Sequence, residues 1–414
     1  MLENLLTDPA AVERRRAGVL GAYLDSFLAA VAELGYTTAT LRGRLWVLGD
    51  LERWLKRKRL ALVGLEEQVL KQFLENQRRH GRFRRSDSRT VHQLLEHLRG
   101  KGIVPSPEPT VDESPLATLK QRYEDYLRKE RGLCPGTGAR YWCFVRQFLV
   151  ERFGQGPMGI RRLAPDDVSS FVLRHACSGN PGATKLMVTA LRSFGRFLFR
   201  SGETQRDLAG ALPTVATWRL AEVPKYLEAH EVERVIQACD RGTSVGRRDY
   251  ALLLLLARLG LRASEVIGLE LDDIDWRAGV LTVRGKGRYH DQLPLPPDVG
   301  KALVTYLRQD RPPCNTRRVF VRNRAPHRGF AHPSSLSTIV RRAVERAGLQ
   351  PNHKGTHLLR HSLATGMLRR GASLAEIGQF LRHHSPNTTE IYAKVDLSGL
   401  RSVAQPWPRK GGGR

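Results

Sequence analysis

Apolar residues recur three and four positions apart along most of the chain, a spacing typical of helices with one buried face. The densest case is residues 249–260, where leucine predominates and predicts a buried helix. Residues 280–283 and 291–295 are short β-prone segments joined by residues 284–288, and they predict two antiparallel strands. Helical spacing returns at residues 334–347, 357–370 and 374–381. We therefore predict a mainly α protein whose C-terminal part carries a small antiparallel β-sheet.

Two interruptions divide this pattern into three blocks. Residues 105–115 carry four prolines in eleven positions and have no periodic apolar face. Residues 211–225, which include Pro213 and Pro224, also lack a sustained helical period. Proline-rich, non-periodic segments are typical of linkers. The predicted parts are a helical domain at 1–104, a linker at 105–115, a helical domain at 116–210, a linker at 211–225, a mixed domain at 226–395 and a tail at 396–414.

The first two blocks resemble each other. Residues 23–102 and 123–202 both run through helix, glycine-containing turn, helix, and two further helices closed by glycine. Gly35 pairs with Gly132, Leu65 with Leu163 and Gly102 with Gly202, at offsets of 97 to 100 residues. This regularity favours an internal duplication of a small helical bundle. Two unrelated helical domains with coincidental spacing are the alternative.

Charge changes this picture from a generic helical protein to one that binds a polyanion. Sixty-eight Lys and Arg against 41 Asp and Glu leave a net charge of +27. Such an excess is typical of proteins that neutralise phosphates, although ribosomal and membrane-surface proteins share it. No basic amphipathic helix stands apart as a membrane anchor would, and in the second block aromatic residues alternate with arginines. We therefore expect both helical blocks to face DNA.

Targeting and redox signals are weak. The first 16 residues contain no apolar segment of the signal-peptide kind, and no run of 18 apolar residues occurs. The five cysteines are odd in number and scattered, without metal-ligand spacing. We predict a cytoplasmic, nucleoid-associated protein without a membrane partner, a disulfide framework or a zinc site.

Candidate chemistry gathers in the third block. Arg262 and Glu265 stand three residues apart just after the leucine-rich helix, so the carboxylate can orient the guanidinium. His357 and Arg360 repeat this spacing. The remaining candidates are Lys286 at the tip of the predicted hairpin, His383 and Tyr392. Each alone has an ordinary structural explanation, as a half-buried aromatic, a core or surface histidine, or a turn residue.

Taken together, these motifs resemble the tyrosine recombinase (phage integrase) family in order and spacing. His383 follows Arg360 by 23 residues and precedes Tyr392 by nine. The resemblance covers residues 225–395, and it implies that 116–210 is a core-binding domain and 226–395 the catalytic domain. The first block looks like the extra N-terminal arm or DNA-binding domain of longer, transposon-borne members. The motifs are Gly260-Leu-Arg262-Ala-Ser-Glu265, Gly285-Lys286-Gly287, His357-Leu-Leu-Arg360-His361, Leu381-Arg382-His383 and Thr388-Thr-Glu-Ile-Tyr392.

The resemblance implies a role for each residue. Tyr392 attacks the scissile phosphate and leaves a 3′-phosphotyrosine and a free 5′-hydroxyl. Arg262 and Arg360 hold the non-bridging oxygens, where negative charge grows in the transition state. The supporting roles are proton donation to the leaving oxygen by Lys286, proton transfer by His357, a phosphate hydrogen bond from His383 and orientation by Glu265. The resemblance implies neither a metal nor another cofactor.

One position departs from the family pattern. The family usually has Leu-Gly-His where this chain has Leu381-Arg382-His383-His384. His383 is therefore preferred over His384 on spacing alone. The arginine at 382 is expected to change the packing under the site or to contact DNA.

The resemblance also implies partners. We expect double-stranded DNA with inverted-repeat core sites, a dimer on each site, a tetramer in the synapse, and possible partner recombinases. Leu400 and Trp407 in the tail either dock on a neighbouring protomer or pack on their own domain. The predicted outcome is integration, excision or transposition of a mobile element. The alternatives are a type IB-like topoisomerase and a non-catalytic DNA-binding protein in which 373–381 begins a helix-turn-helix.

Overall fold

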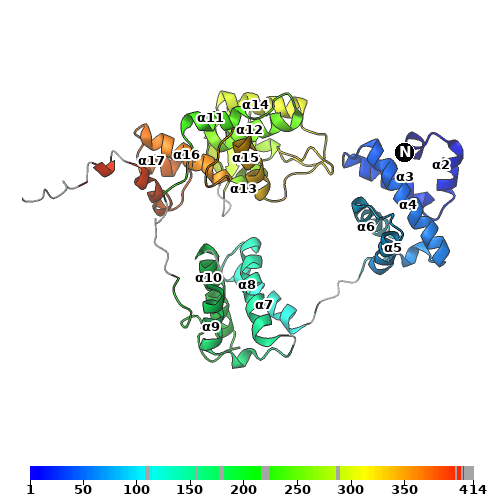
Figure 1. Cartoon of the computed structure of the whole chain (residues 1–414), viewed down its shortest axis with the longest axis horizontal. Helices are drawn as coiled ribbons and strands as arrows, with labels where there is room; N and C mark the ends of the chain where they lie inside the picture. Colours follow the sequence, from blue (N-terminus) through cyan, green and yellow to red (C-terminus); the bar gives the residue numbers. More distant parts are fainter. Residues whose placement is uncertain are drawn as a thin grey trace, which may run out of the picture. The chain divides into compact units, whose positions relative to one another are not determined.

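The computed structural model is mainly helical and contains a three-stranded antiparallel sheet, which confirms the predicted fold class (Figure 1). It describes all residues except 108–111, 113, 155, 177–180, 216–222, 286–289, 397–398, 402–403 and 405–414. Two compact units are present, one formed by residues 107–221 and the other by residues 1–106 with 222–414. Within the second unit, residues 2–104 have a hydrophobic core of their own.

The first helical bundle is built on long leucine-rich faces. In α4 the side chain of Thr37 caps the first turn by accepting a hydrogen bond from the Thr40 N–H, and Trp54 is buried near the other end. Phe27 and Phe73 complete the aromatic part of the core. The elements are α1 (Leu2–Leu5), α2 (Pro9–Arg16), α3 (Gly21–Glu33), α4 (Thr38–Lys58), η1 (Leu62–Gly64), α5 (Glu67–Arg79) and α6 (Arg85–Gly100).

The second bundle packs around aromatic side chains. Tyr123, Phe148, Phe171 and Phe194 are almost completely buried in its core. Its first helix begins at Pro115, the last residue of the predicted linker, and the Ser114 side chain caps it. The elements are α7 (Pro115–Lys129), α8 (Pro135–Phe153), η2 (Ile160–Arg162), α9 (Pro165–Ala176) and α10 (Pro181–Arg200).

The order of elements supports an internal duplication. The series α3, α4, η1, α5, α6 has the same succession of helices and one short 3-10 turn as the series α7, α8, η2, α9, α10. Leu65 and Leu163 each follow that turn directly, and both are buried. The glycine pairs 35/132 and 102/202 all have positive φ, a conformation that glycine adopts at little steric cost. Two unrelated helical domains with coincidental spacing would not be expected to share these features.

The third block is organised around α12 (Ser244–Arg258), whose leucines from Leu252 to Leu256 are all buried. Its sheet has the order β1-β2-β3, with Leu281 opposite both Ile274 and Leu293. The remaining elements are α11 (Ala229–Gln237), α13 (Ala263–Gly268), η3 (Leu271–Asp273), β1 (Ile274–Asp275), β2 (Val280–Arg284), β3 (His290–Pro294), α14 (Pro297–Gln309), α15 (Ser334–Arg346), α16 (Thr356–Arg369), α17 (Leu374–Phe380), η4 (Pro386–Thr388) and η5 (Glu390–Val395).

A small second core lies at the C-terminal side of this block. It consists of four residues buried against one another, namely Ala364 of α16, Ile377 of α17, Leu381 just after α17, and Tyr392 of η5. This cluster fixes α16, which carries His357, η5, which carries Tyr392, and the end of α17, which His383 follows by three residues. The local packing therefore fixes the position of the candidate site. Among the described residues, no helix is long and apolar enough to cross a membrane.

Candidate active site

Arg262 is held in place by Glu265, as the spacing of the two residues predicts. Arg262 precedes α13, and its backbone N–H donates to Glu265 Oε2 at 2.8 Å. Its Nη1 donates to Glu265 Oε1 at 2.7 Å, and its Nη2 donates to the Arg382 carbonyl at 3.3 Å. Burial raises the pKa of the Glu265 carboxyl, but the Arg262 N–H and the Arg382 charge outweigh burial and lower it overall. Glu265 is therefore a fixed anion.

Arg360 joins the ends of two helices. It lies on α16 with 4% of its surface exposed, and it donates to the carbonyl oxygens of Gly260 and Leu381. Gly260 has φ +56°, and a Cβ there would lie 2.7 Å from Leu381 Cδ2. Glycine is thus required where the chain passes Arg360. Burial and the neighbouring charge of Arg262 lower the pKa of Arg360 to about 10, so it keeps its proton at neutral pH.

Tyr392 contacts a histidine that the sequence reasoning did not select. His361 Nδ1 lies 2.9 Å from Tyr392 Oη, and the two rings meet edge to face with centroids 5.6 Å apart. His357 lies one helical turn before His361, with a ring-centroid distance of 6.2 Å. The available signal was His361 itself, which directly follows Arg360 in the His-Leu-Leu-Arg-His motif.

Burial sets the protonation of these groups. Tyr392 is 1% exposed, and burial raises its pKa to about 12 although the Arg360 charge opposes this. Burial, His357 and Arg360 lower the pKa of His361 to about 4, and burial followed by Arg360 also lowers that of His357. At neutral pH the tyrosine is a phenol and His361 is a neutral base. When the proton of His361 is on Nε2, Nδ1 accepts the phenol hydrogen.

His383 lies in the same site. Its Nδ1 is 2.8 Å from Thr389 Oγ1, and burial together with Arg360 and Arg262 lowers its pKa to about 4. His384 is exposed to solvent. This difference in burial and surroundings supports the choice of His383 that rested on spacing.

Lys286 lies outside the described residues, and so does Trp407 of the tail. The strands that carry the hairpin are described up to Arg284 and from His290 onward. Arg284 anchors the base of the hairpin through ion pairs with Glu270 at 3.0 Å and Asp273 at 2.8 Å. Leu400 is 46% exposed.

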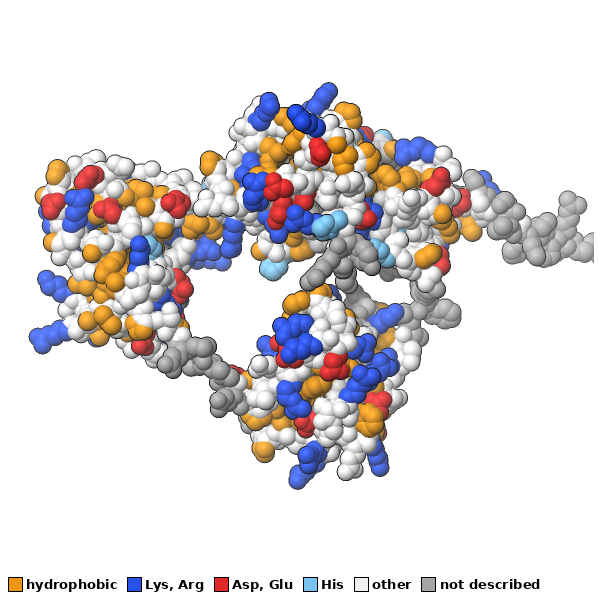
Figure 2. Space-filling view, turned by 180° about the vertical axis from the view of Figure 1, so that it is seen from behind, with side chains coloured by type: hydrophobic (Ala, Val, Ile, Leu, Met, Phe, Trp, Pro, Cys, Tyr) orange, Lys and Arg blue, Asp and Glu red, His pale blue; other side chains and the backbone are white. Residues whose placement is uncertain are grey.

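The arrangement favours a negatively charged, oxygen-rich ligand. Arg262 and Arg360 lie in one site with three histidines, His357, His361 and His383, and Glu265 binds Arg262. Within the described residues no group of three His, Cys, Asp or Glu side chains is placed to hold a metal ion. Basic side chains are also spread over the visible surface of every part of the molecule (Figure 2). A phosphodiester is the ligand that fits this donor set best.

Comparisons with known proteins agree with this geometry. Residues 225–398 match the phage integrase family. A putative integrase/recombinase, y4rA, of Sinorhizobium fredii is 42% identical over 401 residues, which is 96% of this chain and 97% of the relative. The tyrosine recombinase XerC of Oceanobacillus iheyensis is 31% identical, and the match covers 70% of this chain and 96% of XerC.

Solved structures show the same fold. The XerH site-specific recombinase bound to a palindromic difH substrate matches with a TM-score of 0.56 at 18% identity, over 71% of this chain and 89% of XerH. A lambda integrase dimer bound to a core site matches with a TM-score of 0.52 at 17% identity, over 72% of this chain and 99% of that chain. The chain is 42% identical to y4rA over 97% of that relative and 31% identical to XerC over 96% of XerC. It therefore belongs to the tyrosine recombinase (phage integrase) family, and it is a site-specific DNA recombinase.

Proposed function

We propose that Tyr392 is the nucleophile of this recombinase. Its Oη would attack the scissile phosphorus, form a 3′-phosphotyrosine bond and release the 5′-oxygen of the next nucleotide, which leaves as a hydroxyl after gaining a proton. The observation that carries the proposal is that Tyr392 Oη lies 2.9 Å from His361 Nδ1 and is acted on by the charge of the fixed Arg360 guanidinium. At 1% exposure the hydroxyl must move with η5 before it reaches DNA.

Arg262 and Arg360 would bind the two non-bridging oxygens of that phosphate. Both guanidiniums are already oriented, Arg262 by Glu265 and Arg360 by two backbone carbonyls. Donors fixed before the reaction stabilise a growing charge without reorganising during it. A guanidinium has five N–H donors, so hydrogens remain for a phosphate after these bonds are made.

Proton transfer is assigned to the histidines and to Lys286. His361 would accept the Tyr392 proton, because it is the neutral base within hydrogen-bond distance of Oη. His357, one turn away, would support that transfer as predicted. His383 would donate to a phosphate oxygen through Nε2, since its Nδ1 meets Thr389. Lys286 would protonate the leaving 5′-oxygen from the hairpin.

The partners follow from the same proposal. The substrate would be double-stranded DNA with inverted-repeat core sites, bound by a dimer at each site and by a tetramer in the synapse, with or without a partner recombinase. Residues 116–210 would bind the core site, 226–395 would carry out the chemistry, and 1–104 would act as a further DNA-binding arm. Leu400 is exposed enough to meet a neighbouring protomer. A cytoplasmic, nucleoid-associated location remains the sequence-based prediction.

Covalent trapping tests the proposal. Nicked suicide substrates made from DNA that flanks the protein's own gene are incubated with wild type and Tyr392→Phe, followed by a denaturing gel. We expect an adduct with wild type and none with Tyr392→Phe, while both proteins bind the DNA. An adduct of equal yield with Tyr392→Phe would assign the nucleophile elsewhere.

A further inference from the structure

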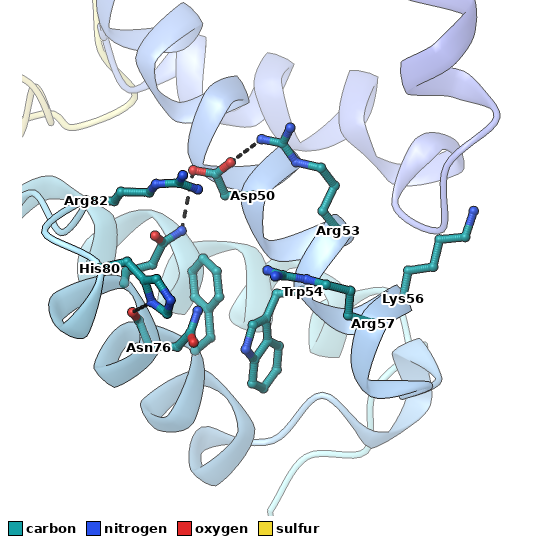
Figure 3. Close-up of a pocket in the computed structure, with 10 residues that line it drawn as sticks. Asp50, Arg53, Trp54, Lys56, Arg57, Asn76, His80 and Arg82 are labelled. Atoms are coloured by element: carbon teal, nitrogen blue, oxygen red, sulfur yellow. Dashed lines mark hydrogen bonds and ion pairs between the residues drawn. The ribbon is translucent and has the colours of Figure 1, made fainter.

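The first bundle contains a pocket of about 670 Å³ between the C-terminal half of α4 and the end of α5 (Figure 3). Trp54 and Phe73 form its apolar wall, packed edge to face with centroids 5.8 Å apart. Most of its rim is basic. The lining residues are Asp50, Arg53, Trp54, Lys56, Arg57, Phe73, Asn76, Gln77, His80 and Arg82.

The positive charge of this rim is not neutralised within the bundle. Asp50, the acidic residue of the lining, is bound by Arg53 and receives a hydrogen bond from Gln77 at 3.4 Å. Among the described residues, no carboxylate forms an ion pair with Lys56, Arg57 or Arg82. Figure 3 shows Arg57 and Arg82 reaching toward the pocket from α4 and from the segment after α5.

Some other cations of the same bundle are paired with carboxylates. Arg16 meets Glu3 at 2.7 Å, and Arg99 meets Glu67 at 2.7 Å. By contrast, Lys56 and Arg57 have no described carboxylate partner, and they stand three and four residues from Arg53 on α4, where like charges repel. This repulsion costs stability in the free protein and is relieved when a polyanion binds. The rim is therefore built for an external anion.

We propose that this pocket, the α4–α5 basic pocket, binds the sugar-phosphate backbone of DNA outside the segment that the catalytic block cleaves. Trp54 is 4% exposed and Phe73 is fully buried, so neither ring is available to stack on a base. The exposed groups are cations, which bind phosphates without reading sequence. The pocket would therefore raise the affinity for DNA and lengthen the DNA segment that is bound, but it would not add sequence specificity.

Salt dependence of binding by the full-length chain tests this proposal. Each phosphate contact contributes about 0.9 to the slope of log affinity against log salt concentration. A triple variant, Lys56→Ala, Arg57→Ala and Arg82→Ala, should reduce the slope by roughly 2 to 3 on a DNA that extends well beyond the cleavage position. Hydroxyl-radical footprints should lose protection away from that position and keep it nearby. Covalent trapping should continue, which separates this test from that of the nucleophile.

A matched triple variant provides the control. Lys71, Arg89 and Lys101 are exposed cations of the same bundle that do not line the pocket and have no described carboxylate partner. Their replacement by alanine removes the same charge and should leave the distal footprint intact. Equal losses in the two triple variants, or an unchanged footprint in the pocket variant with normal thermal stability, would overturn the proposal.

A second, independent observation concerns Arg382. Its φ is +57°, a left-handed conformation that suits glycine and strains a residue with a side chain. Its side chain is nevertheless 6% exposed and lies inside the protein. Arg382 Nη2 donates to Glu265 Oε2 at 2.9 Å, and Asp291 lies 3.8 Å from its Nε. An arginine at this strained position is best explained by these contacts.

These contacts place Glu265 between two guanidiniums. One carboxylate oxygen holds Arg262 Nη1, the other accepts from Arg382, and the Arg382 carbonyl accepts from Arg262 Nη2. We infer that Arg382 is a positioning residue for Arg262. It fixes Glu265 and offsets its negative charge, so Arg262 presents an undiminished positive charge to the phosphate. This inference rests on the proposed role of Arg262.

Two substrates distinguish this role from a merely structural one. Arg382→Gly relieves the backbone strain and keeps the carbonyl, so we expect folding and thermal stability to be retained. Cleavage of a normal nicked substrate should fall about tenfold, less than for direct loss of an oxyanion donor. A methylphosphonate at the scissile position lacks one negative charge, and on it the loss should be much smaller. Arg382→Lys, which keeps the charge, should recover part of the rate.

Equal losses on both substrates would reduce Arg382 to a structural residue, and an unchanged rate on the normal substrate would remove its role altogether. Arg262→Ala, measured in parallel, separates this outcome from failure of the proposed function. If Arg262→Ala cleaves at the wild-type rate, the assignment of Arg262 fails and not only that of Arg382.

Discussion

The arginines of the candidate active site and those of the α4–α5 basic pocket differ in what holds them. Arg262, Arg360 and Arg382 are bound to Glu265 or to backbone carbonyls, and two of the three are buried. In the pocket of the first bundle, Arg57 and Arg82 are exposed and lack a described acidic partner. The same side chain is fixed in one region and left free in the other.

This difference separates two uses of positive charge. A charge that stabilises a transition state must be in place before the reaction, which requires an internal scaffold. A charge that binds the DNA backbone needs only to lie near the phosphates. An exposed, mobile arginine can therefore contribute to the affinity for DNA without a fixed orientation. We therefore expect substitutions in the catalytic site to change rates, and those in the pocket to change affinity.

The largest effect is expected for the two arginines proposed to bind the scissile phosphate. Arg262→Lys and Arg360→Lys keep a positive charge but lose the planar fork and its fixed bonds, so cleavage of a nicked substrate should slow by about 10² to 10³. Arg258→Lys is the matched control, because Arg258 pairs with Glu233 and Asp298 away from the site. Similar rates for all three variants would contradict the comparison.

His361 should come next. His361→Gln keeps a hydrogen-bonding side chain that cannot take up a proton, so the single-turnover cleavage rate should fall by roughly 10². The exposed His384→Gln serves as the control and should cleave like wild type. If the two histidine variants cleave equally well, His361 only packs against Tyr392.

A smaller effect concerns stability against pH. Burial lowers the pKa of His361 and His383 to about 4 from the ordinary 6.5. As the pH falls from 6.5 to 4, the unfolded chain binds protons that the folded chain does not, so the free energy of unfolding decreases. Thermal melting should show a falling Tm over this range. The fall should be shallower in a His361→Gln, His383→Gln double variant, and an equal slope would contradict the burial of these rings.

The smallest rate effect is expected for the pocket. At saturating DNA, the triple variant of Lys56, Arg57 and Arg82 should cleave at nearly the wild-type rate, because these residues act before the chemical step. Quench experiments at rising DNA concentration measure this directly. A rate that remains low at saturation would give the pocket a part in the chemistry and remove the distinction between the two regions.

Local patterns predicted most of the helices and most of the residues proposed for the site, but not β1 or α14. The Arg262–Glu265 ion pair follows from three-residue spacing, and strands β2 and β3 follow from two short apolar segments. The start of α12 was missed by five residues, since the capping bond from the Gly246 N–H to Thr243 Oγ1 replaces the hydrophobic signal there.

Contacts between distant residues could not be read in this way. His361 meets Tyr392 across 31 residues, and Arg382 meets Glu265 across 117. The first depends on how α16 packs against η5, and the second on how α13 lies against the segment after α17. In the sequence, Arg382 is visible only as a departure from the family pattern. Its ion pair with Glu265 could not be predicted from the sequence, because the two residues are far apart along the chain.

Mass spectrometry of the trapped protein–DNA adduct is the most direct test of the central claim. Cleavage by trypsin after Arg382 and Lys394 yields residues 383–394, in which Tyr392 is the only tyrosine. After nuclease digestion, we predict that this peptide carries a nucleotide linked through its 3′-phosphate to Tyr392. The same peptide from the DNA-free protein should lack this nucleotide. An adduct on a peptide that lacks Tyr392 would contradict the assignment of the nucleophile and of the site built around it.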